Sequence, residues 1–272
     1  MTTAHALSDL PGAHLDPSRM PGHWLLARMG KRVLRPGGLE LTRAMLDELA
    51  ITEADDVVEL APGLGATTRL VLERGPATYV GVERDPAAAR ATSRLLRAGR
   101  DECREGTASK TGLGDGAASV VFGEAMLTMH TVDQKAAIVQ EAHRVLRDGG
   151  RYGIHELALA PEALPDARKA EIEAALSDAI HVGARPLTTG EWRATLEAAG
   201  FEIRATRTAP MHLLEPARLV ADEGLLGALR IAVNVLRAPA ARARVRAMRE
   251  VFRRYEGNMC AVALVARKRR AP

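Results

Sequence analysis

Short apolar runs alternate with segments of helical period through the middle of the chain. The runs are rich in β-branched residues and predict strands over residues 56–60, 78–83, 119–124 and 151–157. Between them, apolar residues recur at the spacing of one helix face. Strands that alternate with helices form βαβ units, whose right-handed crossovers build a parallel sheet. The pattern therefore predicts an α/β domain.

Two helix boundaries are predicted from particular residues. Asp85 followed by Pro86 favours a helix start, because the carboxylate caps the first N–H groups and proline fits the first turn. A later helix is expected over residues 133–150 and is closed by Gly149, with the strand at 151–157 after it.

The two ends of the chain lie outside this alternation. Residues 1–22 show no sustained period and are expected to form an irregular arm. Further helices are expected over 23–34, 40–50, 163–182, 188–200 and most of 211–255, and further strands over 201–208 and 259–268. The chain is accordingly divided into an N-terminal arm with a lid helix (1–37), a core (38–210), a helical cap insertion (211–256) and a final core strand with a tail (257–272).

Composition and charge narrow the class of protein. Hydrophobic residues make up 47% and charged residues 26% of the 272 residues, as in chains that fold around a core in water. The 38 Lys and Arg exceed the 34 Asp and Glu by little, and aromatic residues are only 3%, so composition by itself does not indicate a nucleic-acid partner. No apolar run is long enough for a membrane span, and a cytoplasmic protein is expected. Cys103 and Cys260 lack metal-ligand spacing, so no metal site is expected.

The segment 57–68, VVELAPGLGATT, carries the most specific signal in the chain. Its strand ends near Glu59 and leads into a turn with Gly63 and Gly65, followed by a helix. Free N–H groups at a helix N-terminus, without Cβ atoms nearby, allow a polar ligand to approach closely. Glu83 ends the next strand, where a carboxylate can accept hydrogen bonds from ribose hydroxyls. The two acids at successive strand ends indicate a nucleotide-like ligand.

Other nucleotide motifs fit this segment less well. Read from Gly63, the dinucleotide pattern GxGxxG fails at its third glycine, where Thr68 stands. No Gly-Lys-Ser/Thr sequence occurs, which excludes a Walker A loop. An NAD(P)-dependent oxidoreductase stays open as an alternative. So does a non-catalytic or RNA-binding protein on the same fold, which only the arginine-rich segment 242–254 supports.

The segment 59–65, ELAPGLG, resembles the first motif of class I S-adenosylmethionine-dependent methyltransferases, an acid followed by GxGxG, with Ala61 in place of the first glycine. The similarity continues through GVERDP, EAHRVLRDGGRYGIHEL and LTTGEWRATLEAAGFEI. It is closest to the small-molecule branch, the ubiquinone and menaquinone C-methyltransferase-like proteins. The resemblance implies a Rossmann-like, doubly wound, mostly parallel seven-stranded sheet with helices on both faces and a helical cap insertion. It also implies S-adenosylmethionine as the cofactor.

The same resemblance implies which residues meet the cofactor. They lie in the first motif, at the end of the second strand, before the 119–124 strand and at its end: Glu59, Ala61, Gly63, Gly65, Glu83, Arg84, Thr107, Ala108 and Glu124. In this assignment Glu83 binds the ribose, Arg84 lies beside the adenine, and Thr107 or Ala108 meets the adenine edge. Glu124 is a candidate for the methionine amino group.

Two histidines are candidate general bases, because the pKa of imidazole lies near neutral pH. His155 lies near the end of the 151–157 strand and His130 in the loop after the 119–124 strand, at the sheet edge where ligands bind. His23 and Trp24 are expected to close over the pocket from the arm. The expected function is methyl transfer by in-line displacement to a small-molecule substrate, with S-adenosylhomocysteine as product, by a monomer or homodimer.

Overall fold

The computed structural model describes residues 11–12 and 15–269, and every statement below concerns these residues. Parts of the expected arm (1–10 and 13–14) and of the expected tail (270–272) lie outside the described residues. The helices are α2 (Gly22–Arg28), α3 (Gly38–Leu49), α4 (Ala66–Leu72), α5 (Pro86–Ser93), α6 (Val132–Val145), α7 (Asp166–Ile180), α8 (Thr189–Ala198), α9 (Pro216–Arg237) and α10 (Pro239–Arg254). Short 3₁₀ turns lie at η1 (Leu127–Met129) and η2 (Glu256–Asn258).

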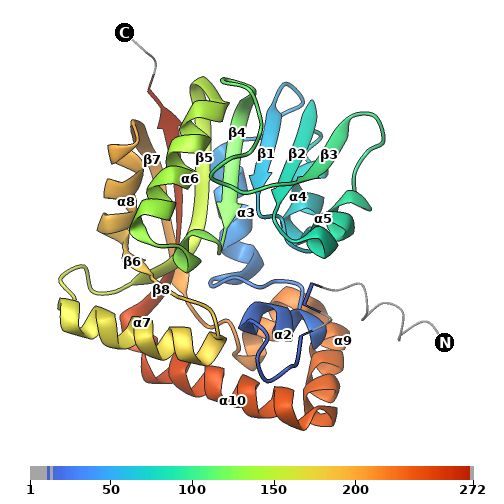
Figure 1. Cartoon of the computed structure of the whole chain (residues 1–272), viewed down its shortest axis with the longest axis vertical. Coiled ribbons are helices and arrows are strands. Elements are labelled where there is room, and N and C mark those ends of the chain that lie inside the picture. Colours follow the sequence, from blue (N-terminus) through green and yellow to red (C-terminus); the bar gives the residue numbers. More distant parts are fainter. Residues whose placement is uncertain (1–10, 13–14, 270–272) are drawn as a thin grey trace.

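The strands form one twisted sheet (Figure 1). They are β1 (Asp56–Leu60), β2 (Thr78–Glu83), β3 (Asp101–Glu105), β4 (Ala118–Glu124), β5 (Leu146–Leu159), β6 (Leu187–Thr188), β7 (Phe201–Pro210) and β8 (Met259–Lys268). Their order is β3-β2-β1-β4-β5-β8-β7, and the two-residue β6 pairs with β5. Only β8 runs antiparallel to its neighbours, β5 and β7. The mostly parallel, Rossmann-like sheet expected from the sequence is confirmed.

Local patterns placed several elements correctly. The predicted bounds of β1, β2 and β8 agree with the structure. Asp85 caps α5, and its carboxylate accepts the N–H groups of Ala87 and Ala88 at 2.8 and 3.1 Å. The sequence did not reveal β3, because its residues, DECRE, are polar and alternate weakly. This edge strand forms through backbone pairing with β2.

Two helix predictions were wrong in extent. The helix expected over 133–150 starts one residue earlier behind a capping box at Thr131 but ends at Val145. Leu146 already pairs with Ala118 in the sheet, and residues 147–150 lie in an irregularity of the strand register, so the glycines there belong to β5. The helix expected over 23–34 is limited to α2, because the chain after it turns away to pack against α9.

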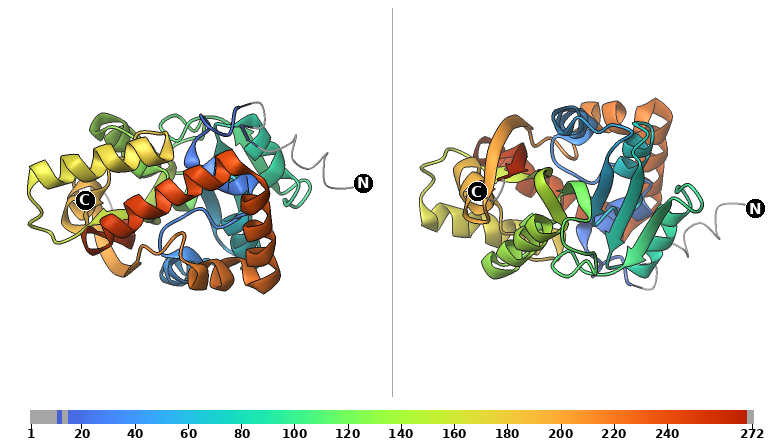
Figure 2. Two further views of the ribbon diagram at one scale, coloured as in Figure 1. Left: turned by 90° about the horizontal axis from the view of Figure 1, so that it is seen from below. Right: turned by 90° about the horizontal axis from the view of Figure 1, so that it is seen from above.

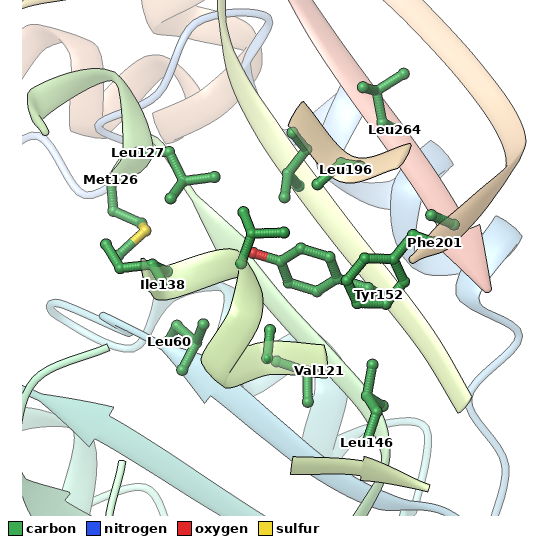
Figure 3. Packing of buried hydrophobic residues seen from close by; sticks show 14 of the residues in the cluster. Leu60, Val121, Met126, Leu127, Ile138, Leu146, Tyr152, Leu196, Phe201 and Leu264 are labelled. Carbon is green, nitrogen blue, oxygen red and sulfur yellow. The ribbon is translucent and has the colours of Figure 1, made fainter. Parts of the chain in front are cut away.

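The core consists of two apolar layers, one on each face of the sheet. The helices α6 and α8 lie in front of the sheet in Figure 1, and α3 lies behind it. On the α6 and α8 face, the Tyr152 and Phe201 rings stack at 5.1 Å, with Leu196 and Leu264 close by (Figure 3). Both faces are therefore covered, as parallel strands require.

The helices α2, α7, α9 and α10 form a separate layer at the carboxyl-end edge of the sheet (Figures 1 and 2). Helix α9 is bound to the segment before α3 and to the first turn of α3. Glu223 accepts the N–H groups of Arg32 and Val33 at 2.7 and 2.9 Å, and Asp222 accepts that of Leu39 at 3.0 Å. Gly38 (φ 62°) lies against Asp222, and a Cβ at this position would collide with that carboxylate. The division into arm, core, cap insertion and final strand stays a prediction. In the described part of the chain, no helix has the length and hydropathy of a membrane span.

Candidate functional site

A cavity of about 770 Å³ lies at the carboxyl ends of the parallel strands. The chain reverses its winding between β1 and β4, and ligands in open α/β sheets bind at such a switch point. The cavity floor consists of the turns after β1, β2, β3 and β4. Its cover comes from α2, residues 32–36, α7 and α10. Segments far apart in the sequence thus enclose one space.

The turn after β1 is open towards this cavity at Gly63. Gly63 has a φ of 60°, which favours glycine, and no atom lies within 4 Å of the place a Cβ would take. Its N–H donates to Glu83 Oε2 at 3.0 Å, and Glu83 Oε1 accepts the N–H of Asp85 at 2.9 Å. The carboxylate at the end of β2 is therefore fixed beside the glycine turn, with lone pairs left for a ligand hydroxyl.

Two other residues of the first motif have different surroundings. Ala61 lines the cavity in a left-handed conformation (φ 55°), and its N–H donates to Val82 at 2.9 Å. Gly65 does not line the cavity; it precedes α4, and a Cβ there would collide with Leu95. The turn thus brings Ala61 and Gly63 to the cavity, whereas Gly65 permits the packing behind it.

Glu59 lines the cavity but is only 3% exposed. Burial raises the pKa of its carboxyl to about 7, although hydrogen bonds from Tyr79 and Thr68 oppose the shift. The Tyr79 and Thr68 hydroxyls both donate to Oε2, at 2.6 and 2.8 Å. Thr68, the residue that breaks the dinucleotide pattern, therefore has a role of its own in holding this acid.

Glu124, at the end of β4, is held by side chains from three other elements, α3, α4 and β5. Its Oε1 accepts from Thr42 at 2.6 Å and lies 2.8 Å from His155 Nδ1, and its Oε2 accepts from Thr67. Burial acts to raise the pKa of Glu124, but the Arg35 guanidinium and the His155 and Thr42 hydrogen bonds outweigh it and hold the pKa at about 2. Glu124 therefore carries a negative charge at the cavity.

Arg35 was not singled out from the sequence, yet it is the cation that pairs with Glu124. Its Nη1 lies 3.5 Å from Glu124 Oε2, and its Nε donates to Thr42 at 2.7 Å. The residue is 7% exposed and lines the cavity, and its Nη2 is buried without a hydrogen-bond partner among the described residues. A buried donor left unpaired is costly, so this nitrogen indicates a missing acceptor. Its sequence signal, one arginine before the turn PGG, was too weak to reveal it.

The remaining expected cofactor residues also lie at the cavity. Arg84 follows β2, and Thr107 and Ala108 follow β3. The next loop, which includes Met126 and η1, is held by Glu156: its carboxylate accepts three backbone N–H groups and the Thr128 hydroxyl at 2.7–3.1 Å. Burial raises the pKa of Glu156 despite these donors. Glu156 therefore fixes the first part of the loop that carries His130.

The two candidate bases differ in their surroundings. His155 is fully buried and does not line the cavity. Its Nε2 lies 2.6 Å from the Pro36 carbonyl and its Nδ1 lies 2.8 Å from Glu124, so both ring nitrogens are occupied by partners within the protein. The expectation that His155 acts as a base finds no support in this geometry. His130 lines the cavity, with its Nδ1 2.8 Å from the Met126 carbonyl, and burial lowers its pKa.

The cavity cover is mainly apolar. It includes Trp24, whose ring lies 4.6 Å from that of His23, and both residues face the cavity as expected for the arm. Burial lowers the pKa of His23 to about 4, so this ring is neutral near pH 7. Apolar side chains of α2, α7, α10 and their connections complete the cover: Leu26, Leu34, Leu176, Ile180, Met211, Leu213, Met248 and Phe252.

Comparisons with known proteins identify relatives. Residues 58–154 match the family model described as a methyltransferase domain. An uncharacterized protein of Haemophilus influenzae is 30% identical over 255 residues, which is 91% of this chain and 98% of that protein.

Solved structures share the fold at low sequence identity. A Haemonchus contortus phospholethanolamine N-methyltransferase 2, in complex with phosphomonomethylethanolamine and S-adenosylhomocysteine, has a TM-score of 0.69 at 14% identity over 92% of this chain and 57% of that chain. A geranyl diphosphate methyltransferase, in complex with GPP and sinefungin, has a TM-score of 0.62 at 15% identity over 85% and 77%.

Proposed function

Since the chain belongs to the class I S-adenosylmethionine-dependent methyltransferases and uses that cofactor, we propose that it methylates a small, largely apolar acceptor beneath its helical cover. The observation that carries this proposal is the Gly63 turn joined to the Glu83 carboxylate at the cavity floor. Within the proposal, the acceptor class follows from the apolar side chains that cover the same cavity.

The residues present fit the cofactor. The space beside Gly63 admits a ligand at the glycine turn, and Glu83 can accept hydrogen bonds from ribose hydroxyls. Arg84, Thr107 and Ala108 border the part of the cavity beyond Glu83, where the adenine is proposed to lie. When bound, the cofactor supplies an electrophilic methyl group on a sulfonium sulfur.

Arg35 and Glu124 are proposed to hold the zwitterionic methionine end of the cofactor. The unpaired Arg35 Nη2 is a donor for a carboxylate, and the charged Glu124 is an acceptor for an ammonium group. The two side chains already form an ion pair. A bound amino acid moiety would add its carboxylate beside Arg35 and its ammonium group beside Glu124, so each charge would still face an opposite charge. His155 is proposed to position this pair from behind, through its hydrogen bond to Glu124.

His130 is the proposed proton acceptor when the acceptor substrate carries a proton. The Met126 carbonyl can only accept, so Nδ1 of His130 carries the proton and Nε2 is left with a lone pair. Burial lowers the pKa of His130, which keeps the ring neutral near pH 7. The apolar cover would exclude water, which leaves positioning of the acceptor as a main source of rate acceleration.

The fold neighbours include enzymes named for both amine and terpenoid substrates. The apolar cover supports an apolar acceptor. We therefore also propose that the chain belongs to the ubiquinone and menaquinone C-methyltransferase-like branch. An acceptor of this kind would present a carbon or oxygen nucleophile to the methyl group.

The decisive experiment is calorimetric titration with S-adenosylhomocysteine and, separately, with NADH. We expect binding of the first and none of the second. Incubation with S-adenosylmethionine and an organic extract of cells, followed by mass spectrometry, should then reveal a product heavier by one methylene unit. Binding of NADH without binding of S-adenosylhomocysteine would refute the proposal and favour an oxidoreductase.

A further inference from the structure

The outward face of α9 is apolar, contrary to what a surface helix in water requires. Four leucines of its second part are largely exposed: Leu225 (73%), Leu226 (83%), Leu229 (61%) and Leu236 (63%). With about 3.6 residues per turn, Leu225, Leu229 and Leu236 share one stripe and Leu226 lies beside it. Such a contiguous exposed patch marks an interaction site.

These leucines are not exposed because α9 lacks a buried face. The inner face of the same helix is already packed: Ile231 is 5% exposed, and Asn234 donates to the Met29 carbonyl at 3.0 Å. The contacts of Asp222 and Glu223 with residues 32–39 fix the end of the first part of α9, directly before the break in the helix at Gly224 (φ 71°). Figure 2 shows α9 and α10 on the outside of the molecule. The orientation of α9 therefore leaves the leucine stripe facing outward.

Positive charge accompanies the stripe. The segment 224–249 contains six arginines and no acidic residue: Arg230, Arg237, Arg242, Arg244, Arg246 and Arg249. Two of them are engaged, since Arg244 donates to the Met20 carbonyl at 2.6 Å and Arg249 to Glu215 at 3.1 Å. The side chains of the other four are exposed and form no ion pair or hydrogen bond within residues 11–12 and 15–269.

The arginines are placed to act with the leucines. Arg230 and Arg237 are seven residues apart, so they share one side of α9, next to Leu226 and along the stripe. Arg242 and Arg246 extend the charge along α10. An apolar helix face edged by arginines is the pattern of a helix that lies in a membrane interface, where leucines enter the acyl boundary and cations meet lipid phosphates.

We propose that this surface, the leucine stripe of α9 with Arg230, Arg237, Arg242 and Arg246, docks on an anionic lipid membrane. A second copy of the chain fits less well, because pairing two such faces brings arginines together with no acid in 224–249 to offset them. An RNA would satisfy the arginines but leave the leucines in water. The docking surface is separate from the cavity lining and does not depend on methyl transfer.

Vesicle co-sedimentation tests this proposal. The full chain should bind phosphatidylglycerol vesicles at low salt, bind pure phosphatidylcholine vesicles at least about tenfold more weakly, and lose affinity as salt rises. The triple variant Leu225→Ser, Leu229→Ser, Leu236→Ser should lose at least about tenfold in vesicle affinity. The double variant Arg230→Gln, Arg237→Gln should lose the preference for anionic lipid.

The matched control is Val132→Ser, which removes an equally exposed apolar side chain (72%) on α6. It should bind vesicles as the parent chain does. Because all substituted side chains are exposed, the variants should keep their unfolding temperature and their affinity for S-adenosylhomocysteine. These two readouts separate loss of docking from loss of folding or of the proposed function.

Three results would overturn the proposal. The first is no binding of the parent chain to anionic vesicles at low salt. The second is a parent dimer that the leucine variant converts to a monomer while vesicles are not bound, which would make the stripe a self-association surface. The third is salt-sensitive binding of an RNA oligonucleotide without vesicle binding.

Discussion

The backbone N–H of Gly63 donates to the Glu83 carboxylate at 3.0 Å, which joins the turn after β1 to the end of β2. The acid thus both shapes the glycine turn and borders the space beside it. In the proposed cofactor site, the same carboxylate would bind the ribose.

Replacing Glu83 with glutamine should weaken S-adenosylhomocysteine binding by roughly 10- to 100-fold, as expected for loss of one or two charge-assisted hydrogen bonds. The amide also places a second donor against the N–H of Gly63 or Asp85. Calorimetry measures the change. Glu105→Gln, on the neighbouring β3 and away from the cavity lining, is the control and should bind normally. An unchanged affinity in Glu83→Gln would remove Glu83 from the ribose site.

Arg35→Gln should separate the two ends of the cofactor. S-adenosylhomocysteine should bind roughly 10- to 100-fold more weakly, because a charged donor for its carboxylate is lost. Methylthioadenosine, which lacks the amino acid moiety, should bind the variant as it binds the parent chain. Arg43→Gln, an exposed arginine on α3, should change neither affinity. Equal weakening of both ligands would show that Arg35 acts on the fold of the site and not on the methionine end.

Glu59 should make folding stability fall as pH rises. Its pKa is about 7 in the folded chain, against an ordinary value of 4.5 for an unfolded one, so the folded state binds the proton more tightly. The stabilisation is fully present below about pH 4 and is lost as pH approaches about 7, by up to about 3 kcal/mol. Glu59→Gln mimics the protonated acid and should remove this dependence.

Urea denaturation of the parent chain and of Glu59→Gln, at about pH 5 and about pH 8, measures the difference between their free energies of unfolding. Relative to the parent chain, Glu59→Gln should have a higher free energy of unfolding at about pH 8 than at about pH 5. Glu73 is an exposed acid after α4, and Glu73→Gln should have the same free energy of unfolding as the parent chain at both pH values. A constant difference between parent and Glu59→Gln would show that Glu59 does not titrate in this window.

Ala61→Gly should stabilise the chain, although glycine usually destabilises. Ala61 has a φ of 55°, where a Cβ costs about 1–2 kcal/mol. The greater conformational freedom of glycine in the unfolded chain lowers this gain in stability by about 0.4–1 kcal/mol. The expected gain in unfolding free energy is up to about 1 kcal/mol. Ala170→Gly, in the exposed interior of α7, should instead lose about 1 kcal/mol. A loss at Ala61 of the same size would mean that its conformation carries no strain.

Much of the sheet could be predicted from the local sequence. The strands β1 and β2 are short runs with β-branched residues, β8 is a longer apolar run, and Asp85 carries its own cap signal. The strand β3 was missed because pairing with β2, and not the apolar pattern of its own residues, makes it a strand. The end of α6 was misplaced for a similar reason, since Leu146 pairs with Ala118 in the sheet.

The candidate site divides in the same way. Glu59, Gly63 and Glu83 lie at strand ends, and a strand end in a parallel sheet is known once the strand is known. Arg35 and Thr42 come from outside the βαβ pattern, and they meet Glu124 only because α3 packs against the sheet. The sequence offered His155 and His130 as candidate bases, and only their partners in the folded chain decide which of the two rings has a free nitrogen.

The sequence by itself therefore determined the α/β alternation, the glycine turn and the acids at the strand ends, because these depend on residues close together in the chain. The tertiary structure alone decided the charge pair at Glu124, the burial of His155 and the outward leucines of α9. Each of these depends on which distant segment lies opposite: residues 29–39 hold α9 through Asp222, Glu223 and Asn234, and its leucines are left facing outward. Burial and pairing between distant segments set these charges and surfaces, and no local pattern encodes them.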